Sequence, residues 1–184
     1  DPNALFPIGT SPHGRSAREP AVGSRGMVAS AHPYASQAGL DILKDGGNAI
    51  DAAVAVASTL NVAEPYMSGI GGIGIALIYI AKENRTRVLN FSGHAPNAAR
   101  PEMYDHLNAE TGPIAPLVPG NVSGWMTMHE IYGSLPLSRV MQDAIQYAEE
   151  GIALTPFNAA MLEENLVRID QFETSQKSVL IERN

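Results

Sequence analysis

The amino-acid sequence predicts a globular α/β-type domain, and three observations support this class. The 184 residues are 45% apolar and 17% charged, a balance typical of a chain that folds around a core. Residues 49–62 are largely Ala, Val, Ile and Leu, which is the pattern of a buried helix. Residues 74–81 follow a run of glycines and are rich in apolar and β-branched residues, which predicts a strand.

The charge and the composition exclude several classes of function. The chain has 12 basic and 19 acidic residues, a net charge of −7, which argues against a nucleic-acid partner. No apolar run reaches the roughly 18 residues needed to cross a bilayer, so no membrane span is expected. The absence of cysteine excludes disulfides, thiolate catalysis and zinc ligation by cysteine. Because the first residue is Asp1 and not Met, removal of an upstream signal peptide is one interpretation, and a periplasmic or extracellular location is slightly favoured over a cytoplasmic one.

The first part of the chain predicts an arm, a short strand and a helix. Residues 1–25 are rich in Pro, Gly, Ser and Arg without periodicity, which predicts an extended N-terminal arm. Residues 26–184 are expected to form the folded part, beginning with a short strand over 26–31. Pro33 fits the first position of a helix that continues over 34–44.

The second helix, over 49–62, has strong start signals. Asn48 is a good N-cap, and Asp51 lies near the positive end of the helix dipole. Glu64 and Pro65 end this helix, and the glycine run follows. The remaining elements are predicted as a hairpin of strands 74–81 and 86–91, a loop over 92–120, and helices over about 121–132, 137–150 and 156–170.

The glycine run suggests a nucleotide site only superficially. Gly69, Gly71 and Gly74 match the spacing G-x-G-x-x-G of dinucleotide-binding proteins. That motif needs a strand before it and a helix after it, so that the helix N-terminus can hold the pyrophosphate. Here the order is reversed, with a helix before the glycines and a strand after them. A glycine-lined turn packed under a buried strand is the better interpretation.

Other patterns carry little chemistry. The five histidines show no His-x-x-x-His or Glu-x-x-His spacing, so no metal site is expected. Residues 120–124 resemble a nucleophile elbow, but the spacing is G-x-x-S-G and no strand precedes it. A helix-starting turn is the better interpretation there. The residue pattern alone therefore names no nucleophile and no cofactor.

Several stretches, taken together and in order, resemble the N-terminal part of the large subunit of gamma-glutamyltranspeptidases. Two of them are Gly-Gly-Asn-Ala-Ile-Asp-Ala-Ala-Val-Ala at 46–55 and Ser-Gly-Ile-Gly-Gly at 68–72. The resemblance covers about residues 26–160. Its other pieces are residues 26–33, 35–39, 64–65, 95–96, 118–125, 132–136 and 148–151.

The resemblance implies an α+β, N-terminal-nucleophile hydrolase fold of four αββα layers, of which this chain supplies a part. Such enzymes are made as one precursor that cuts itself into two chains. The new N-terminal threonine of the small chain is both nucleophile and base. The resemblance thus places no catalytic residue in this chain, implies no cofactor or metal, and names the small subunit from the same precursor as a partner. Family large subunits extend past residue 184, so we expect part of a large subunit or an unusually short one.

The resemblance also locates a substrate site at which this sequence departs from the family pattern. In the family the second strand ends in a pattern like Asp-Phe-Arg-Glu-x-Ala-Pro, whose arginine grips the α-carboxylate of the glutamyl donor. Here residues 90–96 read Asn-Phe-Ser-Gly-His-Ala-Pro, so Ser92 stands where the arginine is expected. Ser92, Gly93 and His94 are the predicted substrate-binding residues. Ile73 also stands where the family usually has glycine, which alters the wall beside the site.

The change from arginine to serine bears on the substrate. A guanidinium fork makes a charge-assisted pair with a carboxylate, whereas a serine hydroxyl offers one neutral hydrogen bond. A protonated His94 would compensate in part, and a histidine bonded to the backbone is at least as good an interpretation.

Three hypotheses follow from these residues. The first is an amide hydrolase or acyltransferase of the family whose donor need not be glutathione. The second is an ordinary glutathione-degrading gamma-glutamyltranspeptidase that binds the α-carboxylate through other residues. The third is a non-catalytic scaffold, which would be favoured if the precursor did not cleave itself. In the first two the partner is a small amide or gamma-glutamyl substrate.

Overall fold

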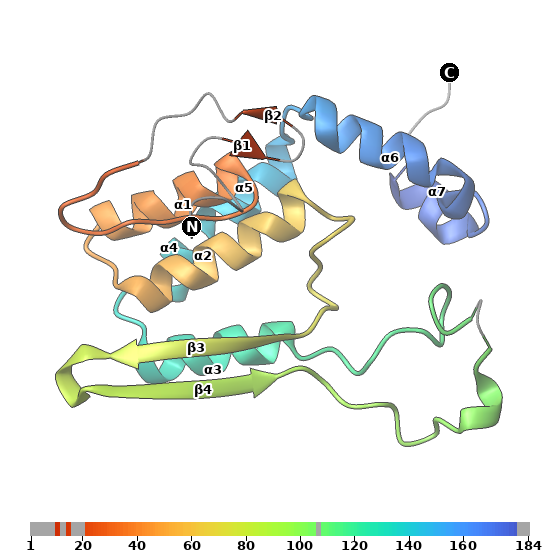
Figure 1. The fold of residues 1–184 in the computed structure, drawn as a ribbon, viewed down its shortest axis with the longest axis horizontal. Helices are drawn as coiled ribbons and strands as arrows, with labels where there is room; N and C mark the ends of the chain where they lie inside the picture. The colour runs from red at the N-terminus through yellow and green to blue at the C-terminus, as the bar shows by residue number, and fades with distance from the viewer. Residues whose placement is uncertain (1–9, 12–13, 16–20, 106–107, 180–184) are drawn as a thin grey trace.

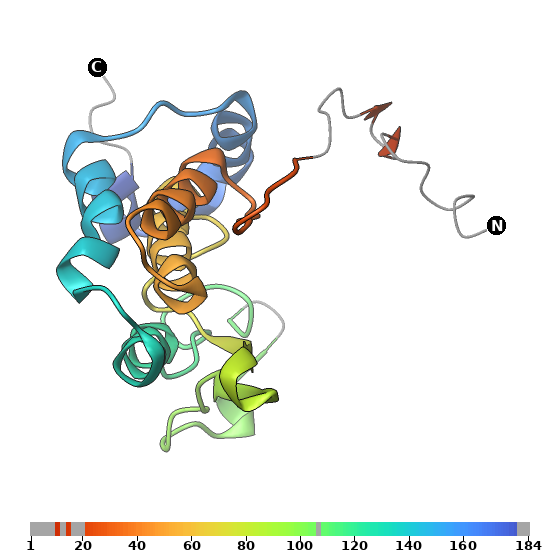
Figure 2. The ribbon, with the colours of Figure 1, turned by 90° about the vertical axis from the view of Figure 1, so that its left-hand side faces the viewer.

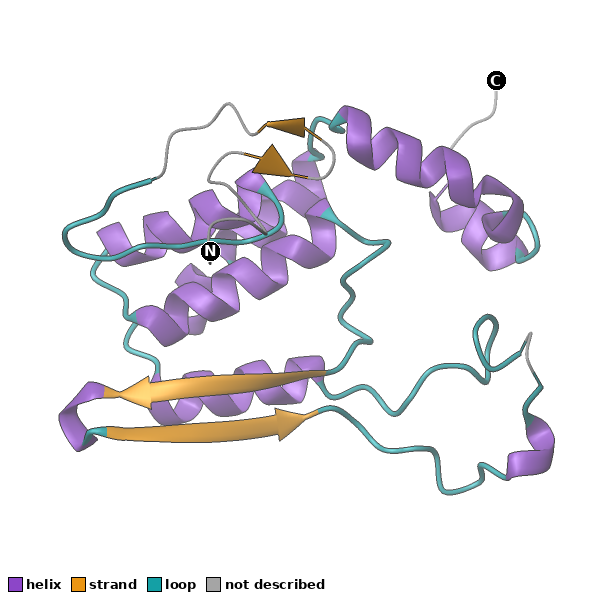
Figure 3. Ribbon diagram, viewed as in Figure 1, coloured by secondary structure: helices purple, strands orange, loops and turns teal. Residues whose placement is uncertain are grey.

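The computed structural model of the chain describes residues 10–11, 14–15, 21–105 and 108–179. Helices make up most of this part, with one long hairpin (Figures 1 and 3). The elements are β1 (Thr10–Ser11), β2 (Gly14–Arg15), α1 (Pro33–Lys44), α2 (Ala49–Ala63), β3 (Gly74–Ile80), β4 (Arg85–Phe91), α3 (Asn121–Tyr132), α4 (Leu137–Val140), α5 (Gln142–Glu150), α6 (Pro156–Ile169) and α7 (Glu173–Val179), with 3-10 turns at Ala81–Glu83 and Pro101–Met103.

Helices α1 and α2 form a closely packed pair. Gly46, with φ of +89°, adopts the left-handed conformation that ends a helix, and the chain turns back there. Asn48 is the N-cap of α2, as the sequence predicts, and together with Asp51 it forms a capping box there. Gly39 lets the two helices approach, because a Cβ there would lie 2.6 Å from Cγ2 of Val56. Close approach of α1 to α2 therefore depends on a missing side chain.

Strands β3 and β4 form an antiparallel hairpin with a regular register, from Gly74 opposite Phe91 to Ile80 opposite Arg85. Asn84, with φ of +49°, closes the turn between them. Helix α3 lies along one face of the hairpin (Figures 1 and 2). The other face is exposed within this chain, and it carries the apolar side chains of Ile75, Leu77, Tyr79 and Val88.

One apolar core joins the helices to the inner face of the hairpin. Helix α2 is central, because it packs against α1, α3, α4 and α5. The buried cluster draws on α1, α2, β3, α3 and α4, and consists of Ile42, Ala52, Val54, Ala55, Ile78, Trp125, Met128 and Val140. The hairpin is thus held by its inner face alone.

Helices α6 and α7 lie beyond the C-terminal end of α2 (Figures 1 and 2). Asn158, which is buried, fastens α6 to that end. Its Nδ2 donates to the carbonyl oxygen of Ala63 at 2.8 Å, and its Oδ1 accepts from the Tyr66 hydroxyl at 3.1 Å. One amide side chain therefore links α2, the segment after it and α6.

The structure corrects the sequence predictions in three places. Residues 26–31 are not a strand, because no backbone hydrogen bond joins them to a strand in the described part of the chain. The single helix predicted over 137–150 is two helices, which meet at Met141 with φ of −90° and ψ of −7°. Helix α7 follows Phe172, in a segment for which no element was predicted. The predicted arm, residues 1–25, falls largely outside the described residues.

Candidate functional site

Three segments that are distant in the sequence meet at one end of the hairpin (Figure 1). They are the glycine turn (residues 68–74), the segment after β4, and the start of α3. The carbonyl oxygen of Gly72 accepts hydrogen bonds from the backbone N–H groups of Gly120 and Asn121, both at 3.0 Å. Asn121 also donates from Nδ2 to the carbonyl oxygen of Gly69 at 2.8 Å. The glycine turn is thereby fastened to the N-terminus of α3.

Phe91, the last residue of β4, accounts for three of the glycines in this region, Gly74, Gly120 and Gly124. Its ring lies between the hairpin and α3. A Cβ at Gly74 would lie 2.5 Å from the ring, and a Cβ at Gly124 would overlap it. A Cβ at Gly120 would overlap the Phe91 carbonyl oxygen. Gly74 and Gly124 make room for the Phe91 ring, and Gly120 makes room for its carbonyl oxygen, so these three glycines have a structural use.

Gly93 fixes the chain directly after the hairpin. Its φ of +76° lies in the region that favours glycine, and a Cβ there would overlap the carbonyl oxygen of Val118. Next to it, the N–H of Val118 donates to the carbonyl oxygen of His94 at 2.9 Å. Residues 92–94 are therefore held at a defined position against the segment that leads into α3.

Ser92 and His94 present side chains that are not engaged elsewhere. The backbone N–H of Ser92 donates to Oδ1 of Asn90 at 3.0 Å, which closes a turn as β4 ends. The Ser92 hydroxyl and the His94 imidazole have no hydrogen-bond partner within the described residues. The alternative in which the imidazole bonds to the backbone is therefore not what the structure shows. His94 is exposed, and Ser92 is half-buried.

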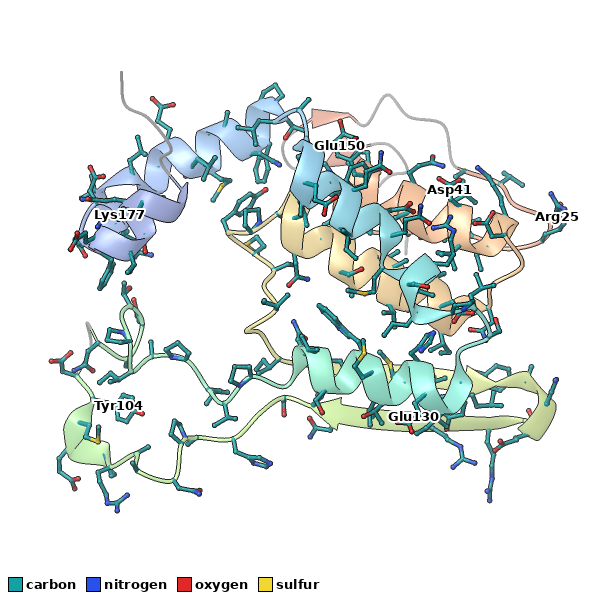
Figure 4. The ribbon with its side chains drawn as sticks, turned by 180° about the vertical axis from the view of Figure 1, so that it is seen from behind. Arg25, Asp41, Tyr104, Glu130, Glu150 and Lys177 are labelled. Carbon is teal, nitrogen blue, oxygen red and sulfur yellow. The ribbon has the colours of Figure 1, made fainter. Side chains whose placement is uncertain are left out.

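The three meeting segments carry no fixed charge of their own. Residues 65–81, 88–99 and 111–129, which include these segments, contain no Lys, Arg, Asp or Glu. Of the charged residues labelled in Figure 4, Glu130 lies near the C-terminal end of α3, and Asp41, Glu150 and Lys177 lie on helices α1, α5 and α7. The three segments can therefore offer neutral hydrogen bonds and apolar contacts.

Comparison with known proteins places the chain in a family. The sequence profile of gamma-glutamyltranspeptidase matches residues 35–183, which is most of the chain. The chain belongs to the gamma-glutamyltranspeptidase family. It is 41% identical over 176 residues to the acylase ACY 1 proenzyme of Pseudomonas sp. (strain SE83), covering 89% of this chain and 31% of that protein. It is 36% identical over 168 residues to the glutathione hydrolase proenzyme of Bacillus subtilis (strain 168), covering 87% of this chain and 28% of that protein.

Solved structures agree with this assignment. The gamma-glutamyltranspeptidase of Helicobacter pylori superposes with a TM-score of 0.81 at 36% identity, over 86% of this chain and 47% of that one. The cephalosporin acylase of Bacillus halodurans gives a TM-score of 0.70 at 37% identity, over 85% of this chain and 31% of that one. The expected α+β, N-terminal-nucleophile hydrolase fold is confirmed. The chain spans less than a third of the length of the two curated relatives.

A second polar cluster in this family member lies at the other end of α3. Asp51 is fully buried and accepts hydrogen bonds from the N–H of Asn48 at 2.9 Å and the hydroxyl of Ser134 at 2.5 Å. Nε2 of His129 lies 3.7 Å from Oδ1 of Asp51 and 2.9 Å from the carbonyl oxygen of Leu135. The residue types match a Ser-His-Asp triad, but the Ser134 hydroxyl donates to Asp51 and has no base to activate it. The cluster is therefore a structural link.

The pKa of Asp51 reflects this role. Burial alone would raise the pKa of the carboxyl, but hydrogen bonds from the Ser134 hydroxyl and from the backbone N–H groups of Asn48, Ser134 and Leu135 lower it below the usual 3.8. Asp51 is thus held as a carboxylate that ties the start of α2 to the segment after α3. The sequence showed its capping role, and Ser134, 83 residues away, was not foreseen.

Two further observations limit the chemistry of the described residues. No group of three or more His, Cys, Asp or Glu residues comes together there in a way that could hold a metal ion. No helix in the same part of the chain is long and apolar enough to cross a membrane.

Proposed function

We propose that this chain is the N-terminal portion, residues 26–184, of the large subunit of a self-processing amide hydrolase or acyltransferase. The nucleophile is the N-terminal threonine of a small chain cut from the same precursor. Two observations support the proposal: the family membership, and the names of the relatives, which include proenzymes of an acylase and of a glutathione hydrolase.

The reaction follows from the chemistry of an N-terminal threonine. Its hydroxyl attacks the carbonyl carbon of the donor amide, and its own α-amine accepts the hydroxyl proton. The C–N bond breaks, the amine leaves with that proton, and the acyl group stays on the threonine as an ester. Water or an acceptor amine then attacks the ester and releases the acyl group. In this scheme the present chain holds the acyl group through Ser92, Gly93 and His94.

The absence of charged residues from the segments around Ser92 is the observation that supports our proposal about the acyl donor. A gamma-glutamyl donor presents an α-carboxylate and an α-ammonium group, and both lose hydration when they bind. Without a guanidinium partner the carboxylate loses a charge-assisted pair, which typically costs about 2–5 kcal/mol of binding. We therefore propose that the preferred donor is an amide whose acyl group need not be gamma-glutamyl.

The exposed apolar face of the hairpin is evidence that a further chain or segment packs against it. A two-stranded hairpin is marginally stable on its own, and a large exposed apolar patch marks a surface that another segment covers. On this chain the outer face of β3 and β4 carries Ile75, Leu77, Tyr79 and Val88, all at least 62% exposed. We propose that the remainder of the precursor, including the small chain, covers this face and adds strands to the sheet.

The test uses the full-length precursor, expressed and allowed to process. Hydrolysis of gamma-glutamyl p-nitroanilide is compared with hydrolysis of a neutral acyl p-nitroanilide, in the wild type and in Ser92→Arg. We expect the wild type to favour the neutral donor, and Ser92→Arg to raise kcat/KM for the gamma-glutamyl donor by roughly 30-fold or more, the equivalent of 2 kcal/mol. Failure to hydrolyse any amide would overturn the proposal.

An ordinary glutathione hydrolase is the second candidate, and the identity to the Bacillus subtilis glutathione hydrolase proenzyme favours it. It would show efficient gamma-glutamyl hydrolysis in the wild type and little change in Ser92→Arg. Those two results together would replace the first proposal by the second.

A further inference from the structure

The end of the hairpin brings Ile73 to the region of the candidate substrate residues. The paired register ends with Gly74 opposite Phe91, so Ile73 and Ser92 are the residues directly beyond this pair. Ile73 is 45% exposed, and Ser92 is half-buried. Ile73 therefore lies at the same end of the hairpin as Ser92.

Gly93 brings a second apolar residue to the same place. A Cβ at Gly93 would lie 3.0 Å from Cγ2 of Ile73 and 3.5 Å from Cβ of Leu117. Leu117 is itself 39% exposed. Ile73 and Leu117 therefore flank the fixed backbone of Gly93, and together we call them the apolar wall. They come from two segments that hydrogen bonds join, from Gly120 and Asn121 to Gly72 and from Asn121 to Gly69.

We infer that the apolar wall is a specificity-determining element, and that the acyl group held next to Ser92 is an unbranched aliphatic chain. This inference rests on the proposed function, because it names the substrate class of that same site. An acyl group lying on Ile73 and Leu117 gains from every methylene it buries, and the Ser92 hydroxyl supplies one neutral hydrogen bond to its polar end. A charged acyl group would lose hydration and meet no opposite fixed charge in residues 65–81, 88–99 or 111–129.

The size of the effect follows from the transfer free energy of a methylene group, which corresponds to about a fourfold gain in binding when the group is fully buried. Ile73 and Leu117 are partly covered by their own chain. An acyl chain that lies on them therefore buries only one of its sides against them. We expect kcat/KM to rise about two- to fourfold for each methylene added between acetyl and hexanoyl donors.

The experiment measures kcat and KM of the processed full-length enzyme for a series of unbranched acyl p-nitroanilides from acetyl to octanoyl, with gamma-glutamyl p-nitroanilide beside them. In Ile73→Ala, kcat/KM is expected to rise less steeply with acyl chain length, so that kcat/KM for the hexanoyl donor is about fourfold or more below that of the wild type. This loss is expected in KM and not in kcat. Ile73→Val, which removes one methyl group, is expected to give an intermediate slope. It provides a usable variant if Ile73→Ala does not fold or process.

Leu77→Ala is the matched control, because Leu77 is an apolar residue of β3 that is 75% exposed and is opposite Val88, away from the end of the hairpin at which Ser92 lies. It is expected to leave the slope unchanged. An unchanged slope in both Ile73 variants, or a wild type that cleaves acyl anilides with no dependence on chain length, would overturn the inference and leave the proposed amide hydrolysis intact. Cleavage of no amide at all would instead count against the proposed function.

Discussion

Replacing Gly93 by alanine should lower the free energy of unfolding by more than the backbone cost of a positive φ alone. Alanine would have to adopt φ of +76°, which costs an L-residue about 1–2 kcal/mol. Its Cβ would also overlap the carbonyl oxygen of Val118 and touch Ile73. Overpacking of that kind typically costs about 1–3 kcal/mol.

The overlap can be relieved only by moving residues 117–118 away from the end of β4. That movement weakens the hydrogen bond from the Val118 N–H to the His94 carbonyl oxygen, which contributes about 1 kcal/mol. Added together, Gly93→Ala should lower the free energy of unfolding by about 3–6 kcal/mol. It should also reduce kcat/KM for every amide donor, because Ser92 and His94 leave their positions.

Gly46→Ala is the matched control for this prediction. Gly46 has φ of +89°, and a Cβ there would meet no atom within 4 Å, so it carries the backbone cost without the overlap. Urea unfolding of the full-length protein should show a loss of about 1–2 kcal/mol for Gly46→Ala. Equal losses in the two variants, with amide hydrolysis unaffected in Gly93→Ala, would refute the reasoning that Gly93 is fixed by its neighbours.

Two further predictions concern the scaffold. Asp51→Asn should lower the free energy of unfolding at pH 7 by about 2–3 kcal/mol, because a buried charged acceptor is lost from the Ser134 hydroxyl. Since the folded pKa of Asp51 lies below 3.8, its contribution is present above that pH and fades as pH falls below it, so urea titrations at pH 7 and pH 3 should show the deficit shrinking in acid. Gly124→Ala should destabilise the protein by about 1–3 kcal/mol despite the better helix propensity of alanine, because the new Cβ overlaps Phe91. Thermal melting should show partial rescue when Phe91→Leu is added. An undiminished stability of the single variant would contradict the close contact between Gly124 and the Phe91 ring.

Much of the fold could be predicted because its signals are local. Pro33 begins α1, and Asn48 is the N-cap of α2, as predicted. The hairpin strands and α3 were placed to within a residue for the same reason. Two of the three corrections depend on what lies around a segment. Residues 26–31 have strand character without a strand partner in the described part, and the break at Met141 interrupts an otherwise continuous helical pattern.

The candidate site could be predicted only in part. Ser92 and its neighbours were singled out through the family resemblance, since nothing in the spacing of these residues marks them as a site. The contact of Gly72 with Asn121 joins positions 49 residues apart, and no local pattern reports such a contact. The closeness of Ile73 and Leu117 to Gly93 likewise brings together residues that are distant in the sequence, and no local pattern reports it.

The most direct test of the central claim is the intact mass and N-terminal sequence of every chain in the purified full-length gene product. Self-processing predicts two chains, and the smaller one should begin with threonine. Its mass and that of the larger chain should add up to the mass of the precursor plus one water. An uncut precursor, or a companion chain that begins with a residue other than threonine, would contradict the proposed nucleophile and favour a scaffold without catalytic activity.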